Sequence, residues 1–222
     1  MRSLADAAQL DRWAAATCLA THSDRRIHTM KRRIEEKRML HVTQRKDWRA
    51  WLKQHYTSEP DIWLVFHKAH TGQPRLSYND AVEEALCFGW IDSTVKSLDE
   101  DRFAQRFSPR RAKSLYSQAN KERLKALAKQ GKIMKDVLAT VANVIAEGDA
   151  FEVPPDILKA IKASKEAWKN FRGFSSAYIR IRMAFIDGAR HRPQEFEKRL
   201  RYFIQMTEKN KQFGFGGIEK HY

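Results

Sequence analysis

Residues 78–93 carry the clearest pattern of apolar and polar positions in the chain. Apolar residues recur there at helical spacing, which predicts a helix with one buried face: Tyr78, Val82, Ala85, Leu86 and Gly89. Three carboxylates, those of Asp80, Glu83 and Glu84, form a second stripe on this helix. Ser77 or Asn79 can cap its first turn, and Gly89 can adopt the left-handed conformation that ends a helix. The pattern therefore predicts a helix whose acidic side needs cationic partners.

The segments on either side of this helix alternate between helical and extended patterns. A helical face predicts a helix over residues 46–56, and a nearly continuous apolar run predicts a strand over residues 61–68 that is covered on both faces. Residues 94–98 and 102–107 alternate with a period of two, and the acidic residues 99–101 suit the turn between them. We expect a small antiparallel sheet with helices packed on it.

The rest of the chain shows only helical patterns, punctuated by Ser, Pro and Gly. The predicted helices run from an N-cap at Ser114 to Gly131, from Lys135 to Glu147, from Pro154 to Gly173, from Ser175 or Ser176 through Ile186, and from Pro193 through Met206. A sheet region followed by a helical region predicts an α+β protein.

Length and composition bound the number of domains, and the apolar pattern divides the chain into three segments. The 222 residues are 42% apolar, which is enough for one domain or two closely packed ones. Residues 1–43 have a weak apolar pattern, and we expect a poorly ordered N-terminal extension that is dispensable for folding. We assign residues 44–131 to an α+β region and residues 132–222 to a helical module.

The net charge of +15 is concentrated in the C-terminal half. Residues 46–111 hold 10 Lys/Arg and 10 Asp/Glu, whereas residues 112–222 hold 22 and 12. Such a surplus favours anionic partners such as nucleic acid or a lipid surface, although it also keeps many proteins soluble. No apolar run reaches the roughly 18 to 20 residues of a membrane span, and two cysteines make no disulfide framework, so we expect a cytoplasmic protein.

Catalytic and metal chemistry find little support in the motifs. Cys87 lies near a predicted helix C-terminus and one turn from Glu83 and Glu84, and both features disfavour the reactive thiolate. His67 and His70 are three residues apart at a strand end, which is a weak metal signal. We therefore expect no catalytic residue, no metal and no cofactor.

Basic residues that lead into a helix form the more specific signal. Arginines beside a helix N-terminus favour an anion, because free amides and the helix dipole both attract negative charge. The candidate anion- or ligand-binding residues are Arg106, Arg110, Arg111, Lys113 and Ser114, together with Trp90 and Asp92. The alternative is structural: these arginines pair with Asp80, Glu83, Glu84 and Asp92.

A second basic group lies further along the chain. Its cations, interleaved with Tyr178 and Tyr202, have the composition of a surface that contacts a nucleic-acid backbone, or of a solvated helical face. The cations are Arg180, Arg182, Arg190, Arg192, Lys198, Arg199 and Arg201.

The sequence YNDAVEEALCFGWIDS at residues 78–93, with FSPRR at residues 107–111 and SLYSQAN at residues 114–120, resembles the YdeI/OmpD-associated family of bacterial proteins, also called bacteriocin-protection. The resemblance extends from about Gln44 to the C-terminus and includes the helices at residues 154–210. It departs at residues 190–194, where the family has a turn richer in Lys and Thr. The resemblance implies a cytosolic bacterial protein of bacteriocin or stress tolerance, and it carries over no catalytic residue.

Three hypotheses for the function follow. The first is a non-enzymatic stress-protection protein with an unknown protein or anionic partner, as the resemblance implies. The second is a polyanion or nucleic-acid binder that uses the basic C-terminal half. The third is an enzyme or small-molecule binder with a pocket around Trp90, Asp92 and residues 108–114. The oligomeric state is not predicted.

Overall fold

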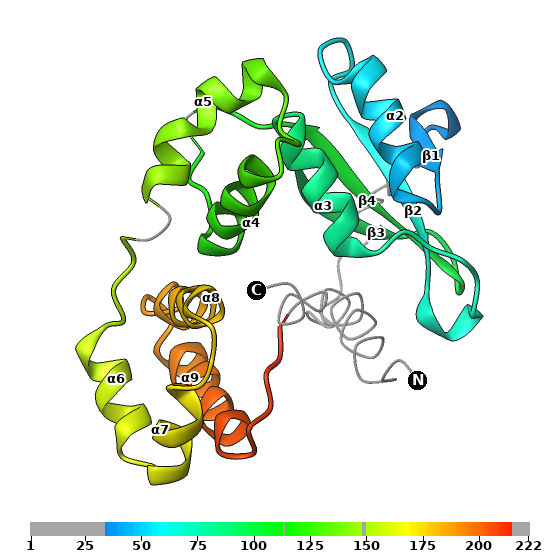
Figure 1. The fold of residues 1–222 in the computed structure, drawn as a ribbon. Helices are drawn as coiled ribbons and strands as arrows, with labels where there is room; N and C mark the ends of the chain where they lie inside the picture. The colour runs from blue at the N-terminus through cyan, green and yellow to red at the C-terminus, as the bar shows by residue number, and fades with distance from the viewer. Residues whose placement is uncertain (1–33, 113, 148–149, 215–222) are drawn as a thin grey trace. The chain divides into compact units, whose positions relative to one another are not determined.

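The computed structural model describes residues 34–112, 114–147 and 150–214 of the chain (Figure 1). The chain divides between Ala112 and Lys113 into two compact units, called unit 1 and unit 2. In the described residues, unit 1 combines a sheet with helices and unit 2 is helical, which confirms the predicted α+β class. The predicted boundary after residue 131 falls within unit 2, and the assignment of residues 44–131 and 132–222 to separate domains stays a prediction.

Unit 1 begins, in its described part, with a short 3-10 helix and ends with a strand. Its elements are η1 (Glu36–Arg38), β1 (Met39–His41), α2 (Arg45–His55), β2 (Ile62–His67), η2 (Ala69–Thr71), α3 (Tyr78–Cys87), β3 (Trp90–Ser97) and β4 (Arg102–Pro109). The helix and strand patterns read from residues 46–107 are thereby confirmed, with shifts at the ends. Ser77 caps α3 by accepting a hydrogen bond from the Asp80 amide, and Gly89 follows α3 with a φ of 70°.

The described strands form one sheet in the order β1-β2-β4-β3. β2 pairs antiparallel with β4, and β4 pairs antiparallel with β3, in agreement with the predicted antiparallel sheet. β1 adds a parallel edge beside β2, with Met39 opposite Trp63. Three residues are too few to show a period of two, so the sequence pattern missed this strand. β3 starts at Trp90, earlier than predicted. The prediction missed its first residues because an irregularity between Asp92 and Val95 interrupts the alternation of the strand.

One face of the sheet is covered by α2 and α3. Trp48 of α2 is fully buried, its indole N–H donates to the Ala81 carbonyl oxygen of α3 at 3.0 Å, and its ring meets the edge of Phe107 of β4 at 5.4 Å between centroids. One tryptophan therefore joins three elements, and its polar N–H is satisfied inside the core.

The opposite face of the sheet carries a second apolar cluster. Trp63, Val65 and Ala104 are buried there, and Ile34, Met39 and Leu98 pack against them. Residues 34–43 therefore differ from the expected poorly ordered extension: they supply η1, β1 and part of this cluster. Residues 1–33, the rest of that predicted extension, lie outside the described residues.

A buried carboxylate ties the β1 edge to the sheet. Asp61, just before β2, is 5% exposed and accepts hydrogen bonds from Arg38 and from Arg106 of β4, the latter with Nη2 at 2.5 Å. Burial alone would raise the pKa of Asp61, but the hydrogen bonds from Arg106 and Arg38 outweigh it and hold this pKa below its ordinary value. The pair of arginines thus makes burial of a full negative charge tolerable.

Unit 2 contains helices that differ from the predicted ones at two caps. Its elements are α4 (Gln118–Lys129), α5 (Lys135–Ala146), α6 (Pro155–Lys162), α7 (Lys165–Phe171), α8 (Ser176–Asp187) and α9 (Pro193–Glu208). Ser117, not Ser114, caps α4, since its hydroxyl accepts from the Asn120 amide at 3.3 Å. The helix predicted from Pro154 to Gly173 is two helices, because the Ser164 hydroxyl accepts from the Ala167 amide and starts α7 anew.

The core of unit 2 is shared by α6, α7, α8 and α9. Its buried members are Ile157, Ile161, Ala167, Phe171, Tyr178, Met183, Ile186 and Phe203. The Tyr178 hydroxyl accepts from the Phe213 amide and donates to the Phe213 carbonyl oxygen, which pins the segment after α9. Arg180 of α8 donates two hydrogen bonds to buried Glu122 of α4, at 2.6 and 3.0 Å, and joins α4 to the core helices.

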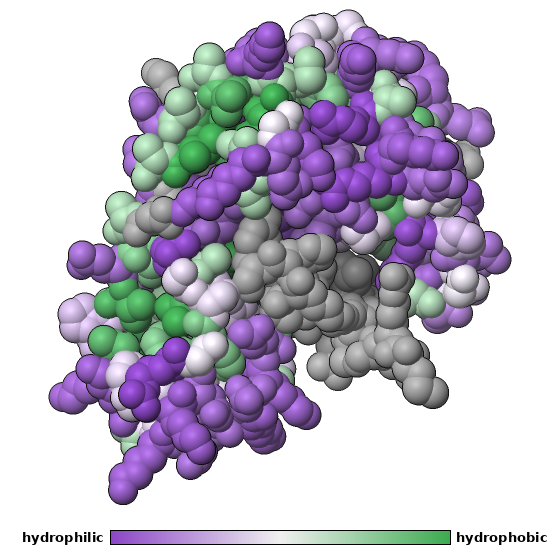
Figure 2. All heavy atoms as spheres, in the orientation of Figure 1, coloured by the Kyte–Doolittle hydropathy of each residue, from purple (hydrophilic) through white to green (hydrophobic). Residues whose placement is uncertain are grey.

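α5 has apolar residues on both sides. Val137 and Val141 are buried, whereas Leu138 is 39% exposed and Ala142 is exposed as well. Figure 2 shows apolar atoms gathered over this helix.

Replacing Arg106 with Met should lower the free energy of unfolding at pH 7 by about 2 kcal/mol, because buried Asp61 loses charge-assisted hydrogen bonds. The native pKa of Asp61 lies below its unfolded value. This contribution is therefore present above pH about 4 and disappears as the pH falls through the native pKa. Urea unfolding at pH 7 and at low pH should show the gap between wild type and variant shrinking in acid.

The matched control is Arg102→Met on the same strand, whose partner Asp99 is exposed. It should leave the unfolding midpoint close to that of the wild type. A gap for Arg106→Met that does not depend on pH would contradict the assignment to Asp61.

Candidate functional site

The acidic stripe of α3 finds its partners on α2. Arg45 contacts all three carboxylates, with N–O distances of 2.6 Å to Asp80, 2.9 Å to Glu83 and 2.5 Å to Glu84. Arg49 adds a contact of 2.6 Å to Glu84. The need for cationic partners was predicted, but the expected partners were the arginines of residues 106–111. A signal was present, since Arg45 and Arg49 are four residues apart and so share one helix face.

Glu84 is the buried centre of this cluster. It is 2% exposed and receives hydrogen bonds from Arg45 Nε and Arg49 Nη1. Burial would lower the pKa of Arg45, but the hydrogen bond and the charge of Glu84 outweigh it and raise this pKa above its ordinary value. These charges hold α2 against α3, so they serve the fold.

Cys87 is buried beside the same cluster. Burial and the charge of Glu84 raise the pKa of its thiol to about 11, against an opposing hydrogen bond from Arg49. The thiol is therefore protonated at neutral pH, in agreement with the unreactive cysteine expected from its helix position.

Two of the predicted site residues are embedded in unit 1. Trp90 is 1% exposed, donates its indole N–H to the Tyr56 carbonyl oxygen at 3.0 Å, and packs edge-on against Trp51. Asp92 accepts hydrogen bonds from the Tyr78 hydroxyl at 2.9 Å and from the side-chain amide of Gln105 at 2.6 Å. Neither residue lines the cavity described below.

The predicted basic residues occupy different environments. Arg106 pairs with Asp61, as described above. The Arg110 amide donates to the Gly89 carbonyl oxygen at 2.9 Å, which places this residue beside the end of α3. Arg111 and Ser114 are exposed, and Lys113 lies outside the described residues. Because α4 starts at Gln118, Ser114 is not at a helix N-terminus, and an anion site formed by these residues stays a prediction.

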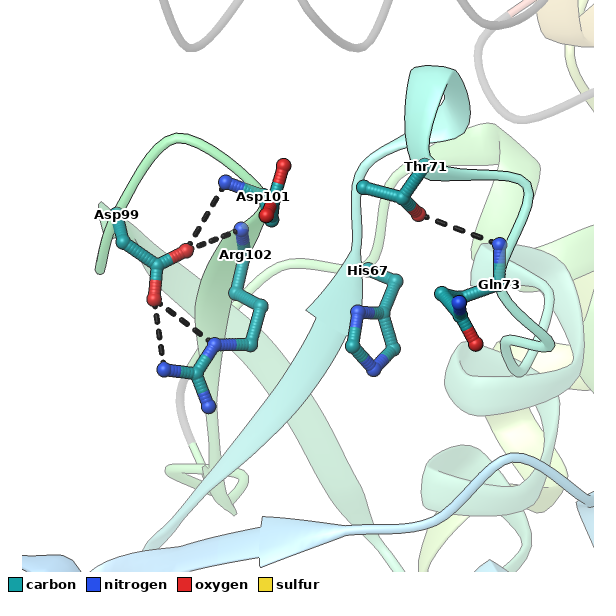
Figure 3. A pocket seen from close by; sticks show the side chains of 6 residues that line it. All are labelled: His67, Thr71, Gln73, Asp99, Asp101 and Arg102. Carbon is teal, nitrogen blue, oxygen red and sulfur yellow. Dashed lines mark hydrogen bonds and ion pairs between the residues drawn. The ribbon is translucent and has the colours of Figure 1, made fainter.

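A cavity of about 580 Å³ opens at another place in unit 1, where β2 ends and the β3–β4 turn begins (Figure 3). Its lining residues are His67, Thr71, Gln73, Asp99, Asp101 and Arg102. Arg102 Nε donates to Asp99 Oδ2 at 2.8 Å, and the amides of residues 101 and 102 donate to Asp99 Oδ1. The Arg102 hydrogen bond lowers the pKa of Asp99.

His67 projects into this cavity between the acidic turn and Thr71 (Figure 3). Its Nδ1 atom is buried and has no hydrogen-bond partner within the part of the chain that the structure describes. His70, the nearby histidine, lies 3.1 Å from Asp101 Oδ1. Across the described residues, no group of three or more His, Cys, Asp or Glu side chains is placed to hold a metal ion. The lining suits a small polar molecule.

The basic residues of α8 and α9 are largely engaged within unit 2. Besides Arg180, which binds Glu122, Arg190 contacts both Asp156 and Asp187, and Arg199 binds Glu195 at 2.8 Å. Arg182 is 7% exposed, and its guanidinium lies 4.1 Å from the centre of the Phe213 ring.

The remaining members of this basic group differ in exposure. Tyr178 is buried in the core, whereas Tyr202 is 45% exposed. Arg192, Lys198 and Arg201 are exposed on and beside α9. Only part of the predicted basic group is therefore available to a partner.

Within the described ranges, no helix combines the length and the apolar character that crossing a bilayer requires.

Replacing Arg45 with Met should lower the free energy of unfolding by about 3 kcal/mol, because Glu84 stays buried with one of its two cations removed. The double variant Arg45→Met/Glu84→Leu should lose less than the two single variants together, since it removes the buried charge as well. Lys46→Met, at an exposed position of the same helix, is the control and should change little. Strictly additive losses in urea unfolding would show that the two residues do not act together.

Cys87 should react slowly with a thiol reagent in the folded protein. In a Cys18→Ser background, labelling at pH 8 should be at least about 100-fold slower than in urea, because a pKa near 11 leaves roughly one thiol in a thousand ionised and burial blocks access. Labelling at equal rates in the folded and unfolded chains would refute this assignment.

Comparison with known protein families divides the chain into two matched segments. Residues 40–140 match a family described only as Domain of unknown function (DUF8412), and this segment contains the motif at residues 78–93. Residues 150–210, from α6 to the end of α9, match the family described as Bacteriocin-protection, YdeI or OmpD-Associated. No curated protein and no solved structure matches the chain. The resemblance to the YdeI/OmpD-associated family that the sequence predicts is therefore confirmed for residues 150–210.

Proposed function

We propose that this protein is a non-enzymatic bacterial protein of the cytosol that serves bacteriocin protection or stress tolerance, and that it acts by binding an anionic macromolecule through unit 2. The family description of residues 150–210 supports the protective role. These residues lie entirely in unit 2, so the segment that matches this family belongs to the unit with the surplus of positive charge.

The observation that carries the proposal is the different use of charge in the two units. In the described part of unit 1, the carboxylates of Asp61, Asp80, Glu83 and Glu84 pair with arginines of the same unit. Over residues 34–112, 13 Lys/Arg nearly balance 12 Asp/Glu. In residues 112–222, Lys and Arg outnumber Asp and Glu by 22 to 12, and several of these acids already pair internally. Cations therefore remain at the surface of unit 2, and such a surface attracts polyanions.

A second candidate function is binding of a small polar molecule, supported by the cavity around His67. Ligand sites combine a concave surface with a few convergent polar groups. The buried His67 Nδ1 and the Asp99–Arg102 pair supply such groups. The predicted pocket around Trp90 and Asp92 is less favourable, because Trp90 is buried in the core.

Binding of the full chain to a fluorescently labelled single-stranded oligonucleotide of about 20 nucleotides tests the main proposal. Fluorescence anisotropy should show binding at low salt, with the logarithm of the association constant falling linearly with the logarithm of the salt concentration. The matched control is an oligonucleotide of the same sequence with an uncharged methylphosphonate backbone, which should bind far more weakly. No binding at low salt, or equal binding of both oligonucleotides, would overturn the proposal.

A further inference from the structure

The two neighbouring helices α6 and α7 carry exposed cations that were not among the predicted site residues. Lys159 and Lys162 lie on α6, Lys165 and Lys169 on α7, and Arg172 at the C-cap of α7, and all five are exposed. Among the described residues, none of the five forms an ion pair with a carboxylate, in contrast to Arg180, Arg190 and Arg199 of the neighbouring helices. We call these five residues together with Trp168 the α6–α7 surface.

Two of the five cations lie against the ring of Trp168. Lys162 Nζ lies 5.0 Å and Arg172 Cζ 5.7 Å from the centre of its ring, and the ring stacks on Phe171 at 5.9 Å. Lys165 and Arg172 precede and follow Trp168 by three and four residues, so helical spacing places them on its side of α7. The tryptophan is partly exposed, so its ring is within reach of a ligand.

The acidic residues near this surface do not cancel its charge. Glu166 lies on α7 itself, and Glu208 of α9 accepts a hydrogen bond from Ser164 at 2.8 Å. Asp156 at the start of α6 is already paired with Arg190. Five cations therefore face two carboxylates that lack a cationic partner in the part of the chain described here.

We propose that the α6–α7 surface is a binding site for single-stranded nucleic acid, in which the five cations contact phosphates and an unpaired base stacks on Trp168. This inference rests on the proposed function, and it specifies the binding site and the class of anionic ligand for that function. Cations that follow the backbone and an aromatic ring that accepts a base are the two features by which proteins bind single strands without sequence preference. Displacing the exposed Lys162 and Arg172 side chains from the ring requires no change in the core.

An anionic membrane is the less favoured partner for this surface. A helix that lies on a bilayer inserts an apolar face among the lipids. The apolar faces of α6 and α7 are already buried in unit 2 through Ile157, Ile161, Ala167 and Phe171. Leu158 and Trp168 are each only partly exposed, and the flat ring of Trp168 suits stacking with a base.

Two triple variants of the full chain, equal in charge, test the site. Lys162→Gln/Lys165→Gln/Lys169→Gln removes three cations of the α6–α7 surface, and Arg192→Gln/Lys198→Gln/Arg201→Gln removes three exposed cations on and beside α9. The α6–α7 variant should bind the labelled single strand at least about tenfold more weakly at low salt. Its salt slope should shrink by about 2, since each lost phosphate contact on a single strand contributes about 0.7. The α9 variant should keep most of the affinity and the slope.

Trp168→Leu tests the stacking role, because Leu preserves an apolar side chain but removes the ring. It should weaken single-strand binding about tenfold and change binding to duplex DNA of the same length much less, since duplex bases are not free to stack. Circular dichroism and thermal unfolding should confirm that each variant stays folded.

Each outcome has a distinct meaning. If the wild type binds and the α9 variant alone loses affinity, or if both variants lose affinity equally, the site assignment fails while the proposed function survives. If the wild type binds neither single strands nor duplex, both fail. Tighter binding to vesicles of anionic phospholipid than to the oligonucleotide, lost in the α6–α7 variant, would overturn the nucleic-acid assignment and leave a lipid-binding surface.

Discussion

The buried carboxylate of Glu84 is the constraint on which unit 1 depends. A charge at 2% exposure is tolerable only with cations against it, and Arg45 and Arg49 supply them from one face of α2. This requirement sets how α2 lies against α3, and Trp48 completes the contact through its bond to the Ala81 carbonyl oxygen. Asp61 repeats the arrangement just before β2, where it pairs with Arg38 and with Arg106 of β4. Unit 1 thus uses its charges to join elements that are distant in the sequence.

Unit 2 uses its charges in two ways. Arg180 serves the fold, since it binds the buried Glu122 of α4. The cations around Trp168 have no such partner in the described residues and remain at the surface. A buried, paired arginine stabilises the fold, whereas an exposed cation without a carboxylate partner is available to a ligand. Ion pairing therefore identifies the structural arginines better than a count of basic residues does.

Much of the fold was predictable from local patterns. The strand of β2, the helix of α3 and its glycine stop at Gly89 follow from periodicity and capping rules that act within a few residues. Local rules were less reliable where two signals compete. Ser114 and Ser117 are both acceptable caps, and Ser164 suits a helix face as well as a new N-cap, so the pattern alone could not choose.

The sequence by itself determined the α+β class, the protonated state expected for Cys87, the need of α3 for cationic partners and the concentration of positive charge after residue 112. Only the tertiary structure decided which cations meet which carboxylates, because pairs such as Arg45–Glu84 and Arg106–Asp61 join residues 39 and 45 positions apart. The periodicity of a sequence describes one helix or strand at a time. It carries no information on which other element packs against that helix or strand. The same limit explains why the α6–α7 surface was not predicted. In the sequence its lysines have the pattern of any solvated helix face, and only the structure shows that they have no carboxylate partner among the described residues.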